Sequence, residues 1–120
     1  MSTTYAIPNG RTVMNATTWT GVSTSSAITV SNADLGTTGF YPDLVWGKPR
    51  SLAYTHGLHD SNRGVAAGRL STNNTSAETA PGSFAYGSVS AFNNNGFTTS
   101  PGSTDNENWN TTSGTYVAWQ

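Results

Sequence analysis

Short stretches in which apolar and polar residues alternate recur along the chain. In residues 27–31, Ile28 and Val30 fall on one face of an extended backbone, while Thr29 and Ser31 fall on the other. Runs rich in Gly, Asn, Ser and Pro separate such stretches, and the pattern predicts about seven to nine short strands. The stretches cover residues 12–20, 27–31, 40–46, 51–59, 65–70, 84–92, 97–99 and 115–120.

This pattern predicts an all-β fold, an antiparallel β-sandwich of the jelly-roll or concanavalin-like type. Two packed sheets are the natural arrangement, because each sheet then buries one of its faces. We expect a single β-sandwich domain over residues 12–120, preceded by an extended N-terminal arm over residues 1–11. An arm at a chain terminus often docks on a neighbour or stays loose.

The strand expected at residues 40–46 is apolar on both faces. Leu44 and Trp46 share one face, and Val45 lies on the other. This arrangement indicates a strand that is covered on both sides. The sequence Gly-Lys-Pro-Arg at residues 47–50 is expected to end it.

Three polar segments are expected to be turns or loops. Asn-Asn-Asn-Gly at residues 93–96 is the strongest hairpin signal, because Asn-Gly tolerates the left-handed backbone of a type I′ turn. Residues 71–83 and 101–114 are the longest polar runs and are expected to face outward.

Composition narrows the class of protein. Apolar residues make up 34% of the 120-residue chain, below the usual share of about 45–50%, but 11% aromatic residues argue against disorder. The few Lys and Arg residues are spread out, so we expect no nucleic-acid binding. No apolar run approaches about 18 residues, so we expect no membrane insertion. The chain has no Cys, which excludes disulfides and thiolate metal sites and favours synthesis in a reducing cytosol.

Candidate chemistry is sparse, and we expect neither catalytic residues nor a cofactor. His56, His59 and Asp60 form the one cluster of metal-ligand residue types, but the spacing argues against a metal site, because His56 and His59 point to opposite faces of a strand. His56 is expected at the edge of the core, and His59 near a turn and partly exposed. Asp43, Asp60, Arg50 and Arg63 are expected to form a polar lock between turns, since Arg pairs well with carboxylates.

Three aromatic residues are candidates for contact with a ligand or partner. Trp109 is the best of them, because it lies inside a polar loop and could stack on a sugar ring. A place in the core is an equal alternative for this residue. Tyr5 and Trp19 follow, although Trp19 is more simply explained as a seal on the core rim.

Several short motifs follow one another along nearly the whole chain. They are Tyr-Ala-Ile-Pro-Asn-Gly-Arg at residues 5–11, Trp-Thr-Gly at 19–21, Phe-Tyr-Pro-Asp-Leu-Val-Trp at 40–46, Lys-Pro-Arg at 48–50, Asp-Ser-Asn-Arg-Gly at 60–64, Ala-Glu at 77–78, Gly-Phe-Thr at 96–98 and Tyr-Val-Ala-Trp at 116–119. This ordered set resembles a family of tail-fibre-like domains of tailed bacteriophages. Gly47 and Asn62 depart from it, since the resemblance leads us to expect apolar side chains there.

The resemblance implies a non-enzymatic virion structural protein, exposed on the particle surface as part of a tail fibre or spike. Its implied partners are other virion proteins and further copies of itself, for example in a trimer, with a host surface glycan as a further ligand. Such a protein would be made in the cytoplasm of the host bacterium. Two alternatives stay open: a decoration protein that cements the phage head, and a carbohydrate-binding module.

Overall fold

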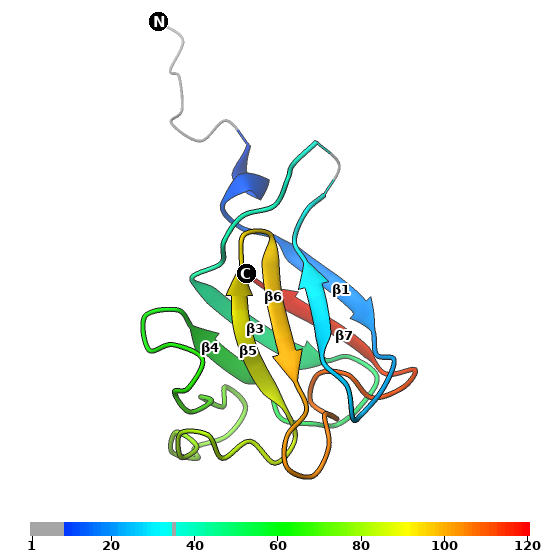
Figure 1. The fold of residues 1–120 in the computed structure, drawn as a ribbon, viewed down its shortest axis with the longest axis vertical. Helices are drawn as coiled ribbons and strands as arrows, with labels where there is room; N and C mark the ends of the chain where they lie inside the picture. Colours follow the sequence, from blue (N-terminus) through cyan, green and yellow to red (C-terminus); the bar gives the residue numbers. More distant parts are fainter. Residues whose placement is uncertain (1–8, 35) are drawn as a thin grey trace, which may run out of the picture.

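The computed structural model describes residues 9–34 and 36–120, and its strands form two antiparallel sheets packed face to face (Figure 1). The first sheet has the order β1-β7-β3-β4, with β1 at Ala16–Thr20, β7 at Thr115–Trp119, β3 at Leu44–Pro49 and β4 at Gly57–Asp60. The second has the order β2-β6-β5, with β2 at Ile28–Ser31, β6 at Gly96–Ser100 and β5 at Ser88–Asn93. The prediction of an all-β antiparallel sandwich is confirmed.

Several strand boundaries differ from those predicted. β4 begins only at Gly57, because its pairing with β3 ends at the Gly47–Gly57 pair, and residues 51–56 form a loop. In residues 65–70 only Leu70 pairs, through an isolated bridge to Leu58. β3, in contrast, continues through Pro49, which lies opposite Tyr116 of β7. The expected break at residues 47–50 is therefore wrong.

The β5–β6 hairpin forms where it was predicted, but its turn is of another type. Asn93 pairs with Gly96, so the two loop residues are Asn94 and Asn95. Neither has the positive φ that a type I′ turn requires, since Ser113 is the only described non-glycine residue with positive φ. Gly96 is needed inside the strand instead: its φ is 140°, and a Cβ there would lie 2.0 Å from the Val30 carbonyl oxygen.

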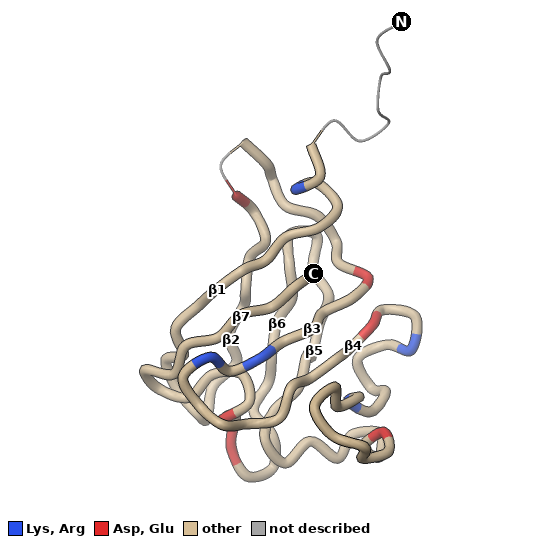
Figure 2. The backbone as a smooth tube through the Cα atoms, turned by 180° about the vertical axis from the view of Figure 1, so that it is seen from behind, with Lys and Arg blue, Asp and Glu red and all other residues tan. Residues whose placement is uncertain are grey.

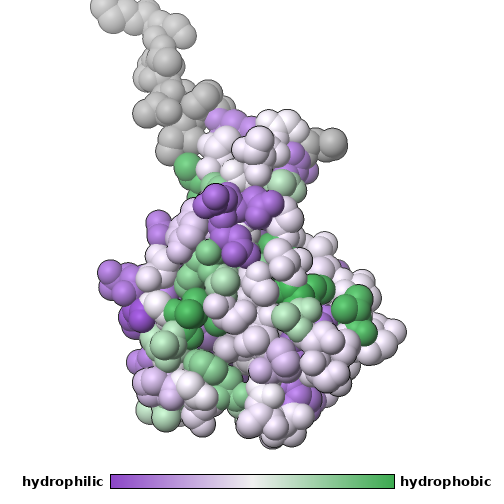
Figure 3. All heavy atoms as spheres, in the orientation of Figure 1, coloured by the Kyte–Doolittle hydropathy of each residue, from purple (hydrophilic) through white to green (hydrophobic). Residues whose placement is uncertain are grey.

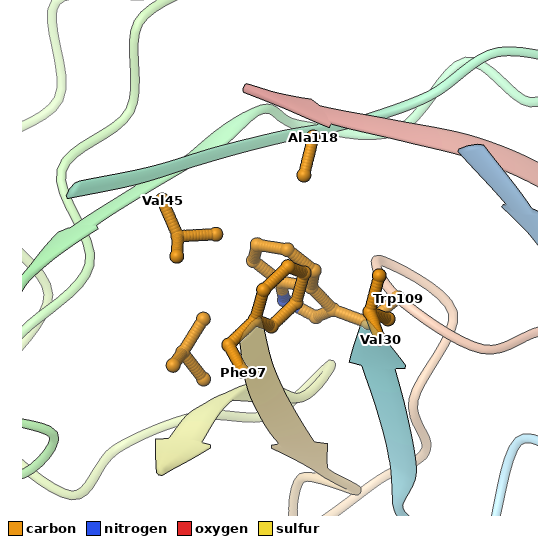
Figure 4. Packing of buried hydrophobic residues seen from close by; sticks show 6 residues of the cluster. Val30, Val45, Phe97, Trp109 and Ala118 are labelled. Atoms are coloured by element: carbon orange, nitrogen blue, oxygen red, sulfur yellow. The ribbon is translucent and has the colours of Figure 1, made fainter. Parts of the chain in front are cut away.

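The core between the sheets is built around a residue that no strand supplies. Trp109 reaches in from the loop before β7 and lies between Val45 and Ala118 of one sheet and Val30 and Phe97 of the other (Figure 4). Its side chain is 1% exposed. The ring packs edge-on against Phe97, with 6.0 Å between the ring centroids.

The middle of the loop at residues 101–114 is accordingly interior, so the prediction that the loop faces outward is wrong for residues 106–110, whereas residues 103–104 and 112–113 are exposed. Asn106 and Asn110 are fully buried, and both side-chain amides donate to the Ser26 carbonyl oxygen at 3.0 Å. Asn110 Oδ1 accepts from the Val22 backbone N–H at 2.8 Å. Both amide nitrogens and the Asn110 side-chain oxygen thus pair with backbone groups of the 21–27 loop, which offsets most of the cost of burying these side chains. Most of residues 71–83 is exposed.

Trp109 also determines which residues β3 and β4 can carry. A Cβ on Gly47 would lie 2.2 Å from Trp109 Cζ3, and one on Gly57 would lie 2.8 Å from Trp109 Cζ2. These two glycines pair across the strands and form a flat floor under the indole. The apolar side chain expected at Gly47 is therefore excluded by lack of space.

We predict that Gly47→Ala destabilises the domain by about 1–3 kcal/mol, the usual effect of overpacking a filled core. The free energy of unfolding from a denaturant titration measures this. Gly10→Ala is the matched control, because a Cβ there meets nothing within 4 Å. Equal unfolding midpoints for the two variants would contradict the packing described above.

Candidate functional site: an apolar groove on the outer face of the β1-β7-β3-β4 sheet

An open apolar groove of about 560 Å³ lies on the outer face of the four-stranded sheet. The sheet contributes Leu44 and Trp46 from β3 and Trp119 from β7. The segments beside the sheet contribute Thr12, Val13, Met14, Phe40, Tyr41 and Asp43, and Gln120, which directly follows β7, also lines the groove. The start of the described chain and the approach to β3 thus form its walls.

Large apolar side chains of this groove are exposed to water. The exposed fraction is 60% for Met14, 53% for Val13, 51% for Tyr41, 49% for Leu44 and 37% for Trp46. Removing such surface from water contributes about 25 cal/mol of favourable free energy per square ångström. A contiguous apolar patch of this kind marks a site of interaction with another molecule.

Figure 3 shows the opposite side of the molecule, over β2, β6 and β5, where hydrophobic residues gather in more than one patch among polar ones. Charged residues are few and lie mostly outside the strands (Figure 2). Among the residues lining the groove, Asp43 alone carries a charge, and its Oδ1 accepts from the Ser61 hydroxyl at 2.5 Å. The groove therefore suits an apolar, uncharged occupant.

The indoles on the groove floor are held in place before any partner arrives. Trp46 and Trp119 lie directly opposite each other on β3 and β7, with 4.9 Å between their ring centroids. Trp46 Nε1 donates to Thr72 Oγ1 at 3.0 Å, and Thr72 Oγ1 also lies 3.2 Å from His56 Nδ1. A preorganised surface loses little side-chain entropy on binding.

The start of the described chain is tied down beside this groove. The short 3-10 helix η1 spans Gly10–Thr12, and the Asn9 side chain caps it by accepting from the Arg11 backbone N–H at 3.1 Å. Arg11 Nη1 lies 2.6 Å from Asp34 Oδ2. Further along, Asn15 exchanges two backbone hydrogen bonds with Gln120. Val13 and Met14 are thus fixed as one wall of the groove.

The structure corrects two of the three aromatic contact candidates. Trp109 is buried at the centre of the core, so its proposed contact with a ligand is wrong. Trp19 is half-buried and stacks on Tyr116 with 5.3 Å between ring centroids, and its Nε1 donates to the Trp109 carbonyl oxygen at 2.9 Å. It seals the core rim, which was the simpler interpretation. Tyr5 lies outside the described residues.

The four residues of the polar lock do not form one cluster. Arg63 Nε lies 2.6 Å from Asp60 Oδ2, and Arg63 Nη1 lies 2.7 Å from Glu78 Oε1. The N–H groups of Arg63, from its backbone first and then its guanidinium, hold the pKa of Asp60 below its usual value. Asp43 bonds Ser61 instead. The prediction that Arg50 belongs to the polar lock is wrong, because the length of β3 puts Arg50 about 20 Å from Asp43.

The two histidines point to opposite sides, and the expectation that His59 is partly exposed is wrong, whereas His56 is half-buried. His59 is 2% exposed and lies between Phe84 and Trp109, with ring centroids 6.3 and 5.8 Å away. Burial, helped by the charges of Arg69 and Arg63, lowers the pKa of His59 to about 4. His56 lies on the groove side, next to Trp46. Among residues 9–34 and 36–120, no three His, Cys, Asp or Glu side chains gather into a metal site.

Sequence reasoning missed the groove as a site, although a signal for it was present. Leu44, Val45 and Trp46 are apolar on both faces of β3. That signal was interpreted as a second layer of the protein over the strand. In the structure the outer face is left open, so the same signal marks an exposed apolar surface.

Comparison with known proteins places the chain in a family. A family model described as a domain of unknown function, DUF7483, matches residues 10–120. The chain belongs to this family. Comparison with curated proteins and with solved structures gave no significant match. In the described part of the chain, no helix is long and apolar enough to span a membrane. Family membership assigns no residue a role, so function is argued from the groove.

Proposed function

We propose that this chain is a non-enzymatic structural protein of a bacteriophage virion, exposed on the particle surface as part of a tail fibre or spike. The groove is the observation that supports assembly into a particle. Exposed large apolar residues on a preorganised sheet face favour a permanent protein contact. The ordered motifs from residues 5–11 to 116–119 support the assignment to a phage particle.

In this proposal the groove faces another subunit, and the partners are further copies of the chain, for example in a trimer, and other virion proteins. The exposed residues 71–83 face outward, where a host surface glycan is a candidate ligand. The absence of Cys fits a protein made in the host bacterial cytoplasm before particle assembly. The burial of Trp109 removes the observation that had favoured a free carbohydrate-binding module.

The test is to locate the chain on phage particles purified from the host that produces it. Antibodies raised against the isolated domain and detected by electron microscopy should label the tail. Label spread over the head would identify a capsid decoration protein instead. Particles that stay unlabelled while the domain is detected free in the lysate would refute a virion role altogether.

A further inference from the structure

We propose that the groove receives residues 5–8 of a second copy of this chain, Tyr-Ala-Ile-Pro, so that neighbouring subunits exchange N-terminal arms. This inference rests on the proposed function and names the occupant of its contact surface. Three observations lead to it: the chemistry of the groove, its size, and the point at which the described chain begins.

The chemistry of the groove matches that of the arm. Its floor and walls are aromatic and aliphatic, and Asp43 is the one charged lining residue. The first eight residues, Met-Ser-Thr-Thr-Tyr-Ala-Ile-Pro, contain no charged side chain, and their apolar residues are concentrated at positions 5–8. An occupant of this composition would cover Leu44 and Trp46 without burying an unpaired charge.

The size of the groove suits a short extended segment. Its volume of about 560 Å³ lies within the range of roughly 300–1,000 Å³ for pockets that bury most of a bound group. A few side chains fill such a space, whereas a folded element would not enter it. Tyr5 and Ile7 lie on the same face of an extended backbone, so both could point into the groove.

The start of the described chain favours docking on a neighbour over docking on the same subunit. Asn9 has an extended backbone, with φ of −132° and ψ of 106°, and η1 is held by the Arg11–Asp34 ion pair. The residue before a proline disfavours helical angles, so Ile7-Pro8 favours continued extension. Because Val13 and Met14 wall the groove only a few residues later, docking in the same subunit would require a sharp reversal at residues 8–10.

The chain offers a direct test, because it contains no native cysteine. Two singly substituted full-length proteins, Ile7→Cys and Leu44→Cys, are mixed under mild oxidation, with a tag on one of them so that the heterodimer has its own size. Leu44 is 49% exposed, so its substitution spares the core. The matched control is Thr18→Cys, exposed on the outer face of β1 in the same sheet but outside the groove.

Ile7→Cys should form a disulfide with Leu44→Cys at least about tenfold faster than with Thr18→Cys, because docking raises the effective concentration of the thiols. Equal rates would overturn the proposal. They are the result expected if a different protein, and not the arm, occupied the groove. A disulfide formed inside one chain of the Ile7→Cys/Leu44→Cys double variant, with no heterodimer in the mixture, would show docking in the same subunit and also overturn it. Thermal melts confirm that each variant is folded.

Loss of the arm provides a second readout. Removal of residues 1–8 should lower the mass of the oligomer measured by analytical ultracentrifugation, and Leu44→Asn should lower it in the same way. An unchanged mass for both proteins would also contradict arm exchange. These measurements use the isolated chain, whereas the virion role is tested on particles. A negative result for arm exchange therefore does not decide the virion role, and a negative result for the virion role does not decide arm exchange.

Discussion

Trp109→Ala is expected to destabilise the domain by about 3–5 kcal/mol, the range for removing a large aromatic side chain from a packed core. The indole is 1% exposed and touches both sheets, so its loss leaves a cavity between them. Part of that cavity borders Gly47 and Gly57, which have no side chains to move into it. Because typical domains are stable by only about 5–15 kcal/mol, the variant would be close to unfolding.

Denaturant titration monitored by circular dichroism measures this difference, and Trp46→Ala is the matched control. Trp46 is also a tryptophan in contact with neighbours, but it is 37% exposed and lies on the groove. Its removal should cost less than that of Trp109, since more than a third of its surface already faces water and its loss opens no cavity between the sheets. If Trp46→Ala were as destabilising as Trp109→Ala, the loop residue would not be the centre of the core.

Acidification from pH 6.5 to pH 4 should cost the domain about 3 kcal/mol through His59, at about 1.36 kcal/mol per unit of pKa difference. The pKa of His59 is lowered to about 4 in the folded chain, mainly by burial, whereas an unfolded histidine has a pKa near 6.5. Above pH 6.5 neither state binds the proton. Between the two values only the unfolded state binds it, so stability falls with pH and levels off below about pH 4.

Unfolding free energies measured across this pH range should show most of the slope in the wild type and in His56→Gln, and a much smaller slope in His59→Leu. His56 is the other histidine of the chain; burial, followed by the charge of Lys48, also lowers its pKa, so it accounts for the slope that stays in His59→Leu. A His59→Leu protein that lost as much stability between pH 6.5 and 4 as the wild type would show that the slope comes from other groups. Asp60, whose pKa is lowered by Arg63, contributes only at lower pH.

The parts of the fold that could be predicted are those determined by neighbours in sequence. Alternation placed Ile28 and Val30 on the inner side of β2, and Asn-Gly marked the β5–β6 hairpin. The turn type was wrong because the need for Gly96 comes from close contact with Val30 of the adjacent strand, which no local signal contains.

Trp109 could not be placed because its surroundings come from distant parts of the chain. The sequence of its loop is polar, but Asn106 and Asn110 are buried. Both donate hydrogen bonds to Ser26, which lies 80 and 84 residues earlier in the chain. Trp19 bonds the Trp109 backbone from 90 residues away. Composition predicts a surface loop in such a case, and only the tertiary contacts convert it into the centre of the core.

The groove was partly predictable. The apolar outer face of β3 was visible in the sequence, but whether a layer of the same protein or a partner covers it depends on the path of the chain after β3. Trp119 and Met14 join the groove only through the pairing of β7 with β3 and through the loop after η1. Neither contact leaves a local pattern.

The position of β7 has a consequence for how the protein is made. β7 lies between β1 and β3, and so pairs with strands that the ribosome completes much earlier. Until residues 115–119 have been translated and released from the exit tunnel, β1 and β3 have no common partner and expose unpaired strand edges. The four-stranded sheet therefore closes as a late, long-range event, and a nascent chain waiting for it is most vulnerable to aggregation during that interval.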